Sequence, residues 1–247
     1  MNGRDRRAQD ILPRDGQPRW RVLGVGETRQ YPQNAIASLR FHIQSPSGSV
    51  PFFAGTGWFV APALVVTAAH VLDVTNAWNR VPNATQWDLE VIPGIVNGDR
   101  PFGSFRANHV EVHPGYRASG LLSSHDIALV SCSETAFGPG DCLKLAANAV
   151  ENADRVRLSG YPFVVDRGGT PVEGEGPVDA VEGDHVFYDI DVEDGESGSP
   201  ILGPSPERGV VGIHLGGTGH GASSIARTRN VGLRMRDDLA QWIAQFV

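Results

Sequence analysis

The sequence predicts an all-β protein, on three observations. The 247 residues include 30 Gly and 17 Pro, which suits many short strands joined by turns. β-rich segments recur along the chain between clusters of turn residues, as in a barrel or a sandwich. This length is also common for an all-β double barrel that folds as one unit.

The predicted elements follow in order. Seven segments are rich in β-forming residues: 35–43, 55–72, 87–96, 126–132, 155–161, 185–192 and 209–217. The segment 109–116 also alternates like a strand. The last apolar residues are spaced i, i+3, i+4 and i+7: Leu239, Trp242, Ile243 and Phe246. This spacing predicts an amphipathic C-terminal helix that packs on the body of the protein.

Charge and hydropathy limit the partners. The net charge of −7 argues against a nucleic acid or an anionic membrane, whose phosphates would need a basic patch. The longest apolar run, 58–66, contains Pro62 and is too short to span a bilayer. The N-terminus has no apolar stretch of signal-peptide length, so a cytoplasmic location is expected, or secretion if a signal has been removed.

Residues 1–21 contain several Arg and Asp without a periodic apolar pattern, and we interpret them as a leader or propeptide. The two cysteines, Cys132 and Cys142, flank one loop. They could close it as a disulfide in an oxidising compartment, whereas in a cytosolic chain two separate thiols are expected.

The stretch VEDGESGSPI at 192–201 surrounds Ser197 with small residues. Gly195 and Gly198 allow positive φ or a close backbone approach, so the stretch predicts a tight turn with exposed N–H groups. A serine is a poor nucleophile unless a base takes its proton and a carboxylate fixes that base. The chain should therefore supply a histidine and an acid.

Two stretches supply these groups. VVTAAHVL offers His70 directly after a β-branched strand, where small alanines permit a turn and a short helix. SSHDIALV offers Asp126 at the entry to an apolar strand, where burial beside an imidazole is expected. Asp141 and Asp154 are the competing acids, and the strand entry favours Asp126.

The motifs TAAH, DIAL and GESGSP, in this order, resemble the signature stretches of chymotrypsin-fold serine peptidases. FYDIDVEDGESGSP followed by GVVGIHLGG is similar to the glutamyl endopeptidase branch of that fold, and the likeness runs from about residue 22 to 247. The resemblance implies two six-stranded antiparallel β-barrels and a C-terminal helix. It places the first barrel at about 22–135, and the second barrel with the helix at about 136–247.

The resemblance also implies an activity, that of a serine endopeptidase acting on a protein or peptide through an acyl-enzyme. Its triad would be His70, Asp126 and Ser197, and the N–H groups of Gly195 and Ser197 would form the oxyanion hole. No cofactor and no metal is expected, because His109 and His113 lack a third ligand.

The substrate side chain before the scissile bond, P1, should bind between the segment before Ser197 and the strand GIHLGG. In the resembling branch the histidine of GIHxGG binds a P1 glutamate, and the matching residue of this chain is His214. Gly216 and Gly217 would pair with the substrate backbone. The chain departs from the branch at Val192, where a threonine is expected. Asp191 stands where an aspartate makes other members prefer Arg or Lys. Cleavage after Glu or Asp is the first hypothesis, and a basic P1 preference is the alternative.

The stretch WRVLG suggests an activation site, because trimming of a leader frees an aliphatic amine in many members of this fold. Cleavage after Arg21, by another protease or by the enzyme itself, would then let the Val22 amine pair with a carboxylate such as Glu196. Two other hypotheses for the function remain open. The chain could be a catalytically inactive peptide-binding module on the same fold, or another acyl-transfer enzyme such as an esterase. The oligomeric state is not indicated by the sequence.

Overall fold

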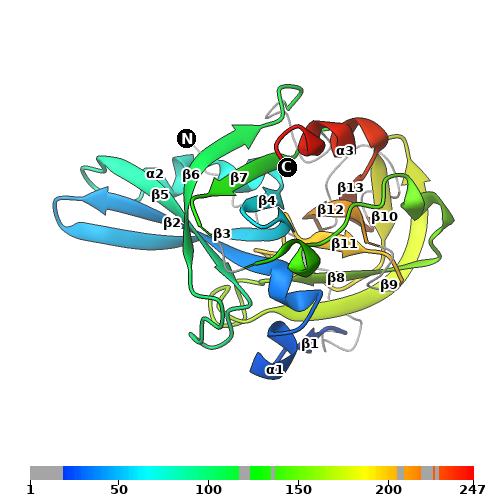
Figure 1. Cartoon of the computed structure of the whole chain (residues 1–247), viewed down its shortest axis with the longest axis horizontal. Helices are drawn as coiled ribbons and strands as arrows, with labels where there is room; N and C mark the ends of the chain where they lie inside the picture. The colour runs from blue at the N-terminus through cyan, green and yellow to red at the C-terminus, as the bar shows by residue number, and fades with distance from the viewer. Residues whose placement is uncertain (1–18, 117–122, 135–136, 205–208, 218–224, 226–227) are drawn as a thin grey trace.

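The computed structural model describes residues 19–116, 123–134, 137–204, 209–217, 225 and 228–247. Most of the predicted leader, residues 1–18, lies outside the described residues. The described chain forms two β-barrels that lie against each other, with a helix at the C-terminus (Figure 1).

The first barrel is a closed ring with the strand order β2-β3-β4-β7-β6-β5. Its strands are β2 (Ile36–Ser45), β3 (Gly48–Ala61), β4 (Leu64–Thr67), β5 (Gln86–Pro93), β6 (Phe105–Val112) and β7 (Ala128–Cys132). Every neighbouring pair is antiparallel. Trp58 and Phe59 are adjacent in β3 and so lie on opposite faces of the strand, yet both are fully buried.

The second barrel runs in the order β9-β10-β13-β12-β11-β8, and an additional pairing of β8 with β9 closes it. Its strands are β8 (Arg155–Gly160), β9 (Val172–Glu182), β10 (His185–Tyr188), β11 (Pro200–Leu202), β12 (Val210–Gly216) and β13 (Asn230–Arg234). The predicted fold class, two six-stranded antiparallel barrels, is therefore confirmed.

A short extra strand, β1 (Arg21–Val22), pairs with the outer side of β9. The sequence assigned Val22 to the first barrel, whereas the structure pairs it with Val172 of the second. The next residue, Leu23, is buried, and its N–H donates to Pro171 O at 3.0 Å. The chain therefore reaches the first barrel only after it has passed along the second.

Short helices connect the strands: α1 (Val25–Thr28), α2 (Thr75–Trp78) and the 3-10 turns η1 (Gln33–Ala35), η2 (Ala69–Leu72), η3 (Pro139–Asp141) and η4 (Ala149–Asn152). The predicted C-terminal helix is α3 (Asp237–Ala244), which buries Leu239, Trp242 and Ile243. Phe246 lies beyond the end of α3 and is 40% exposed. The amphipathic stripe thus predicts the helix correctly, except for its last member.

The larger apolar core joins the barrels, because it includes Trp58 of β3 together with Ile213 and Leu215 of β12. Polar contacts reinforce this junction at Thr56, whose N–H donates to Ser197 O at 3.0 Å.

Cys132 and Cys142 are buried in the same apolar core as free thiols. Burial raises the pKa of the Cys132 thiol to about 12. No helix in the described part of the chain is long and apolar enough to cross a membrane.

Candidate active site

His70 lies in η2, directly after β4, and its environment is set by one carboxylate. Its Nδ1 is 2.7 Å from Asp126 Oδ2, and its backbone N–H donates to Asp126 Oδ1 at 2.9 Å. Asp126 is fully buried at the entry to β7. A carboxylate only accepts hydrogen bonds, so the ring proton belongs on Nδ1 and Nε2 of the neutral imidazole can act as a base.

Ser197 lies on the turn that precedes β11, on the second barrel, and lines the same cleft as His70 and Gly195. The cleft has a volume of about 270 Å³. Among the described residues, the Ser197 hydroxyl donates to Leu215 O at 3.2 Å rather than to His70. Catalytic hydrogen bonds are often formed only with substrate present, and a change of the Ser197 rotamer would redirect Oγ.

Gly195 explains why the turn needs glycine. Its φ is +104°, and a Cβ there would lie 2.4 Å from the Phe53 ring and 2.7 Å from Tyr161 O. The carbonyl of Asp194 accepts a hydrogen bond from Phe163 N–H at 2.6 Å. The N–H of Gly195 belongs to the same peptide and points the opposite way. Gly195 lines the cleft together with Ser197.

Gly198 fixes the other side of the serine. Its φ is +87°, and a Cβ would meet Thr56 O at 2.2 Å. Its N–H donates to His214 O at 2.8 Å, which ties the turn to β12. The same Cβ would lie 2.3 Å from Thr67 Oγ1 of β4.

The predicted specificity residues lie on the second barrel. Asp191 and Val192 are buried in the segment before the turn, and His214 is buried on β12, with 1% exposure. The hydroxyl of Tyr188 is 2.5 Å from His214 Nδ1. Burial raises the pKa of Tyr188 well above its ordinary value, so this phenol stays protonated beside the imidazole.

Two glycines predicted to bind the substrate backbone, Gly216 and Gly217, follow His214 on the second barrel. Gly216 ends β12 opposite Val231, with an irregular register after His214, and Gly217 is buried. The next seven residues, 218–224, lie outside the described residues.

Arg19 is a contact of Asp191 that the sequence did not reveal. Its Nη2 lies 3.0 Å from Asp191 Oδ1 and 3.2 Å from Asp189 Oδ1. The Asp191 side chain is fully buried, whereas the Arg19 side chain is 57% exposed. Asp191 therefore has a compensating cation that arrives from the chain before β1. No local motif could indicate this pair, because its members are 172 positions apart.

The predicted activation residues are engaged in the same region. Arg21 forms ion pairs with Glu27 and, at 2.9 Å, with Glu173. Val22 is 51% exposed in β1. The proposed partner of its amine, Glu196, is buried, and its Oε2 accepts a hydrogen bond from Glu193 N–H at 2.8 Å.

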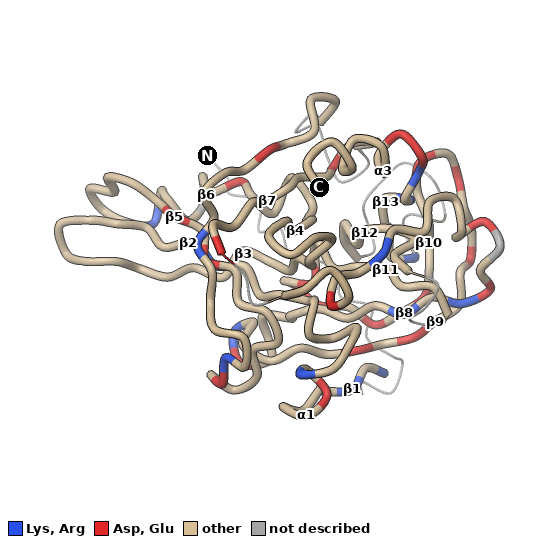
Figure 2. Tube along the Cα trace, viewed as in Figure 1, with Lys and Arg blue, Asp and Glu red and all other residues tan. Residues whose placement is uncertain are grey.

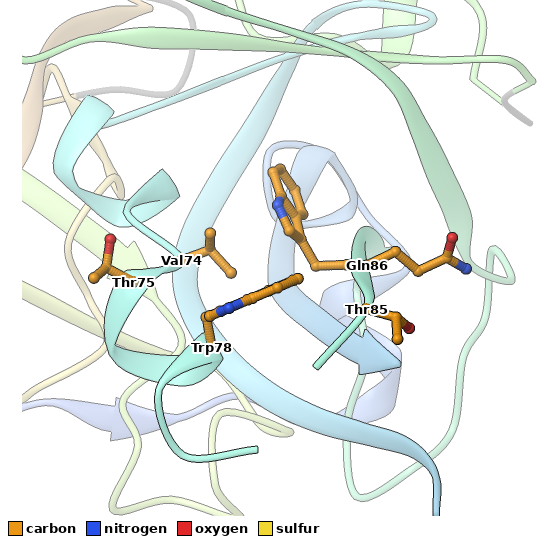
Figure 3. A pocket seen from close by; sticks show the side chains of 6 residues that line it. Val74, Thr75, Trp78, Thr85 and Gln86 are labelled. Carbon is orange, nitrogen blue, oxygen red and sulfur yellow. The ribbon is translucent and has the colours of Figure 1, made fainter. Parts of the chain in front are cut away.

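A second hollow lies beside α2. It has a volume of about 470 Å³ and is lined by Val74, Thr75, Trp78, Thr85, Gln86 and Trp87 (Figure 3). None of the predicted catalytic residues lines it.

Acidic and basic positions are spread along the described trace and form no single basic block (Figure 2).

A serine and a histidine–aspartate pair at one cleft between two antiparallel six-stranded barrels define a class, the chymotrypsin-type serine peptidase fold. The model of the trypsin-like peptidase domain matches residues 55–213, and the chain belongs to that family.

Two relatives of the chain are named glutamyl endopeptidases. The chain is 28% identical over 228 residues to a glutamyl endopeptidase of Bacillus licheniformis, covering 88% of this chain and 66% of that protein. It is also 28% identical over 186 residues to a glutamyl endopeptidase of Staphylococcus aureus, covering 71% of this chain and 49% of that protein. The chain thus spans about two thirds and about half of their lengths, respectively.

Among solved structures, a Glu endopeptidase in complex with MPD is similar, with a TM-score of 0.67 and 22% identity. The match covers 94% of this chain and 97% of that chain. This likeness agrees with the fold described above.

Proposed function

We propose that the protein is a serine endopeptidase that hydrolyses peptide bonds through His70, Asp126 and Ser197. The observation that carries the proposal is one cleft lined by Ser197, Gly195 and His70, whose ring is held by Asp126. A peptide-binding module on this fold would not need these groups together. The family match and the names of the relatives support the same assignment.

The geometry suggests how each group acts. His70 Nε2 takes the proton of Ser197 as Oγ attacks the scissile carbonyl carbon. The N–H groups of Gly195 and Ser197 stabilise the oxyanion, each by about 3 kcal/mol in the transition state. The imidazolium then gives its proton to the leaving amine as the C–N bond breaks. Water, deprotonated by the same imidazole, hydrolyses the acyl-enzyme and releases the acid.

We further propose a preference for Glu or Asp at P1. His214, held by Tyr188, supplies an imidazole near the expected pocket, and the relatives are named glutamyl endopeptidases. A lone buried Asp191 would favour Arg or Lys instead. The guanidinium of Arg19, 3.0 Å away, offsets that charge and weakens the argument for a basic preference.

A panel of peptides that differ only at P1 tests both proposals, with Ser197→Ala as the control. We expect the highest kcat/KM after Glu or Asp, and no hydrolysis by the variant. Faster cleavage after Arg than after Glu would overturn the acidic preference and leave the peptidase assignment standing. Equal hydrolysis by wild type and Ser197→Ala would overturn the assignment itself. Ester hydrolysis without peptide hydrolysis would indicate an esterase.

A further inference from the structure

Asp126 is carried into the first barrel by a short stretch of chain, residues 123–126, which we call the Asp126 segment. Strand pairing fixes its downstream end, because Ala128 pairs with Thr67 of β4 and with Val112 of β6. Within the segment, the N–H of Asp126 donates to Ser123 O at 3.3 Å. This hydrogen bond joins the segment to itself, so it does not determine where the segment lies relative to the rest of the protein.

Arg236, a residue of the second half of the chain, contacts the Asp126 segment directly. It follows β13 and is the N-cap residue of α3, which lies against the first barrel near the start of β7 (Figure 1). Its Nη1 and Nη2 both donate to Ser124 O, each at 3.2 Å. Ser124 is two residues before Asp126, so this contact ties the segment that carries the buried carboxylate to the end of the second barrel.

Two carboxylates orient the guanidinium of Arg236. Its Nε and Nη2 donate to the two oxygens of Asp238, at 3.0 and 2.9 Å. Its Nη1 also lies 3.2 Å from Asp184 Oδ1, in the turn between β9 and β10. A planar guanidinium held on two sides presents its remaining N–H groups in a fixed direction. Here they meet at the Ser124 carbonyl, and a hydrogen bond from a charged donor is stronger than one between neutral groups.

The backbone that carries Arg236 is fixed to the second barrel. The preceding residue, Met235, is buried, and its N–H donates to Val211 O at 2.9 Å. The carbonyl of Arg236 accepts a hydrogen bond from Ala240 N–H at 2.9 Å, in the first turn of α3. The guanidinium is therefore mounted on regular structure, which is the kind of support that holds an active-site geometry precisely.

An arginine that served only the ion pairs of α3 would not need the third contact. Asp184 and Asp238 are both partly exposed, and exposed ion pairs contribute little to stability. The two hydrogen bonds to Ser124 O lie instead in a nearly buried place, where the Arg236 side chain is 12% exposed. They act on the segment whose position decides whether Asp126 reaches His70.

We propose that Arg236 is a positioning residue, which holds the Asp126 segment so that the carboxylate keeps both hydrogen bonds to His70. The proposal rests on the proposed peptidase function and adds to it a residue that touches neither the substrate nor the reacting atoms. The contacts to be preserved are those of Asp126 with His70 Nδ1 at 2.7 Å and with His70 N–H at 2.9 Å. A misplacement of about 1 Å in such a geometry can lower the rate by about 10².

The kinetic test replaces Arg236 by methionine, which keeps a long apolar stem and removes the guanidinium, and by lysine, which keeps the charge on a flexible stem. On the best peptide of the P1 panel we expect kcat of Arg236→Met to fall by about tenfold or more, with KM within about twofold of wild type. Arg236→Lys should recover part of the loss, because one ammonium can still donate to Ser124 O. If Arg236→Met does not fold, Arg236→Lys carries the test, with kcat lower by about threefold or more and KM unchanged.

Arg234→Met is the matched control. Arg234 lies two residues earlier, its side chain is 18% exposed, and its Nη1 is 2.6 Å from Glu151 Oε1. Both methionine variants lose a nearly buried guanidinium and its carboxylate partner, so urea unfolding should show similar losses of stability. Only Arg236→Met should lose kcat. An equal loss of kcat in Arg234→Met, or a kcat within about twofold of wild type in both Arg236 variants, would overturn the proposal.

Proton NMR tests the same contact without any substrate. The Nδ1 proton of His70, held by Asp126, should give a resolved signal far downfield that His70→Ala lacks. Arg236→Met should lose or broaden this signal, whereas Arg234→Met should retain it.

The two readouts separate this proposal from the one on which it depends. If wild type hydrolyses peptides while the Arg236 variants keep both kcat and the signal, the positioning role is wrong and the peptidase stands. If wild type hydrolyses no peptide but its signal is lost in Arg236→Met, the peptidase is wrong and the positioning of Asp126 stands.

Discussion

Asp126 accepts two hydrogen bonds from one residue, His70, and this pair defines the base of the proposed triad. In Asp126→Asn the amide can donate to Nδ1 and stabilise the wrong tautomer, so Nε2 loses its role as acceptor. We expect kcat to fall by about 10⁴. Steady-state kinetics on a Glu peptide measure the loss. Asp154→Asn, at an exposed competing acid, should stay near wild type, and a similar loss in both variants would contradict the role of Asp126.

Gly195 allows the loss of an oxyanion donor to be distinguished from backbone strain. Gly195→Ala places a Cβ against Phe53 and Tyr161 O at positive φ, which must move the peptide that carries the proposed oxyanion donor. We expect kcat to fall by about 10² or more, with a smaller change in KM. Gly183→Ala also has positive φ but nothing within 4 Å of the added Cβ. It should keep full activity, with stability lower by about 1 kcal/mol. Comparable activity losses in the two variants would refute a specific role for Gly195.

Sequence patterns could predict the residues whose neighbours along the chain reveal them. Ser197 lies between glycines, and Asp126 begins an apolar strand. His70 follows a β-branched strand and two alanines. Thr56 could not be found this way: its hydroxyl accepts from Tyr161 N–H and donates to Gly195 O, and both contacts exist only after the barrels meet. Tyr188 and Arg19 were missed because their partners, His214 and Asp191, are distant in the sequence.

The segment 19–22 contributes to the second barrel through Arg19. Because Arg19→Ala leaves the buried Asp191 carboxylate without its cation, we expect a free energy of unfolding lower by about 1–2 kcal/mol, reduced by the exposure of Arg19. The variant should also cleave after Glu less well relative to Arg. Arg21→Ala loses more exposed ion pairs, and we expect less than about 1 kcal/mol and an unchanged P1 ratio. Urea unfolding and the P1 panel measure both effects. An unaltered P1 ratio in Arg19→Ala would contradict the electrostatic role of Arg19.

Cleavage after Arg21 stays a prediction, and the contacts of residues 19–22 indicate what the cleaved protein would need. The cut falls within β1 and separates Arg19 from Val22. A product that keeps its activity must therefore replace the Arg19 contacts at Asp191. Comparing the activity of the intact chain with that of a chain beginning at Val22 shows whether cleavage raises or lowers activity.

The contact between α3 and the end of β6 should depend on pH. The His113 ring stacks on His125 at 4.5 Å and meets Trp242 at 4.7 Å. Burial, and then the neighbouring His125, lower the pKa of His113 below its ordinary value of 6.5. The unfolded chain then binds this proton more tightly. The contribution of His113 to stability is therefore present above about pH 6.5 and is lost as the pH falls toward the lowered pKa.

Urea unfolding between pH 7 and 5 checks this expectation. The free energy of unfolding should fall with pH in wild type and fall less steeply in His113→Gln. His109→Gln is the control, because His109 is exposed in β6 and pairs with Glu111. Identical slopes in wild type and His113→Gln would contradict the assignment.

The predicted strands correspond to elements whose apolar residues are continuous or alternate clearly. β9 was not among them, because its sequence VEGEGPVDAVE is acidic and contains Gly and Pro. Its inner positions are nevertheless closely packed: a Cβ at Gly176 would lie 1.8 Å from Asp189 O. β11, with three residues, is too short to give a pattern, and β13 was not identified either.

At the scale of the whole molecule, the proposed chemistry depends on the junction of the barrels. The first barrel supplies His70 and Asp126, and the second supplies Ser197. The apolar core that includes Trp58 and Ile213 holds them in one body. Composition and turns predict only an all-β chain, whereas the three ordered motifs indicate which barrels form. The cleft itself was not predictable, because its walls come from β2, β3, η2 and α2, which are separated in sequence.

The central claim, that folding turns Ser197 into an activated nucleophile, is tested most directly by labelling with a fluorophosphonate and locating the adduct by mass spectrometry. The account predicts one adduct, on Ser197, which is lost in His70→Ala although that variant remains folded. An adduct on another residue, or equal labelling of Ser197 in wild type and His70→Ala, would contradict it.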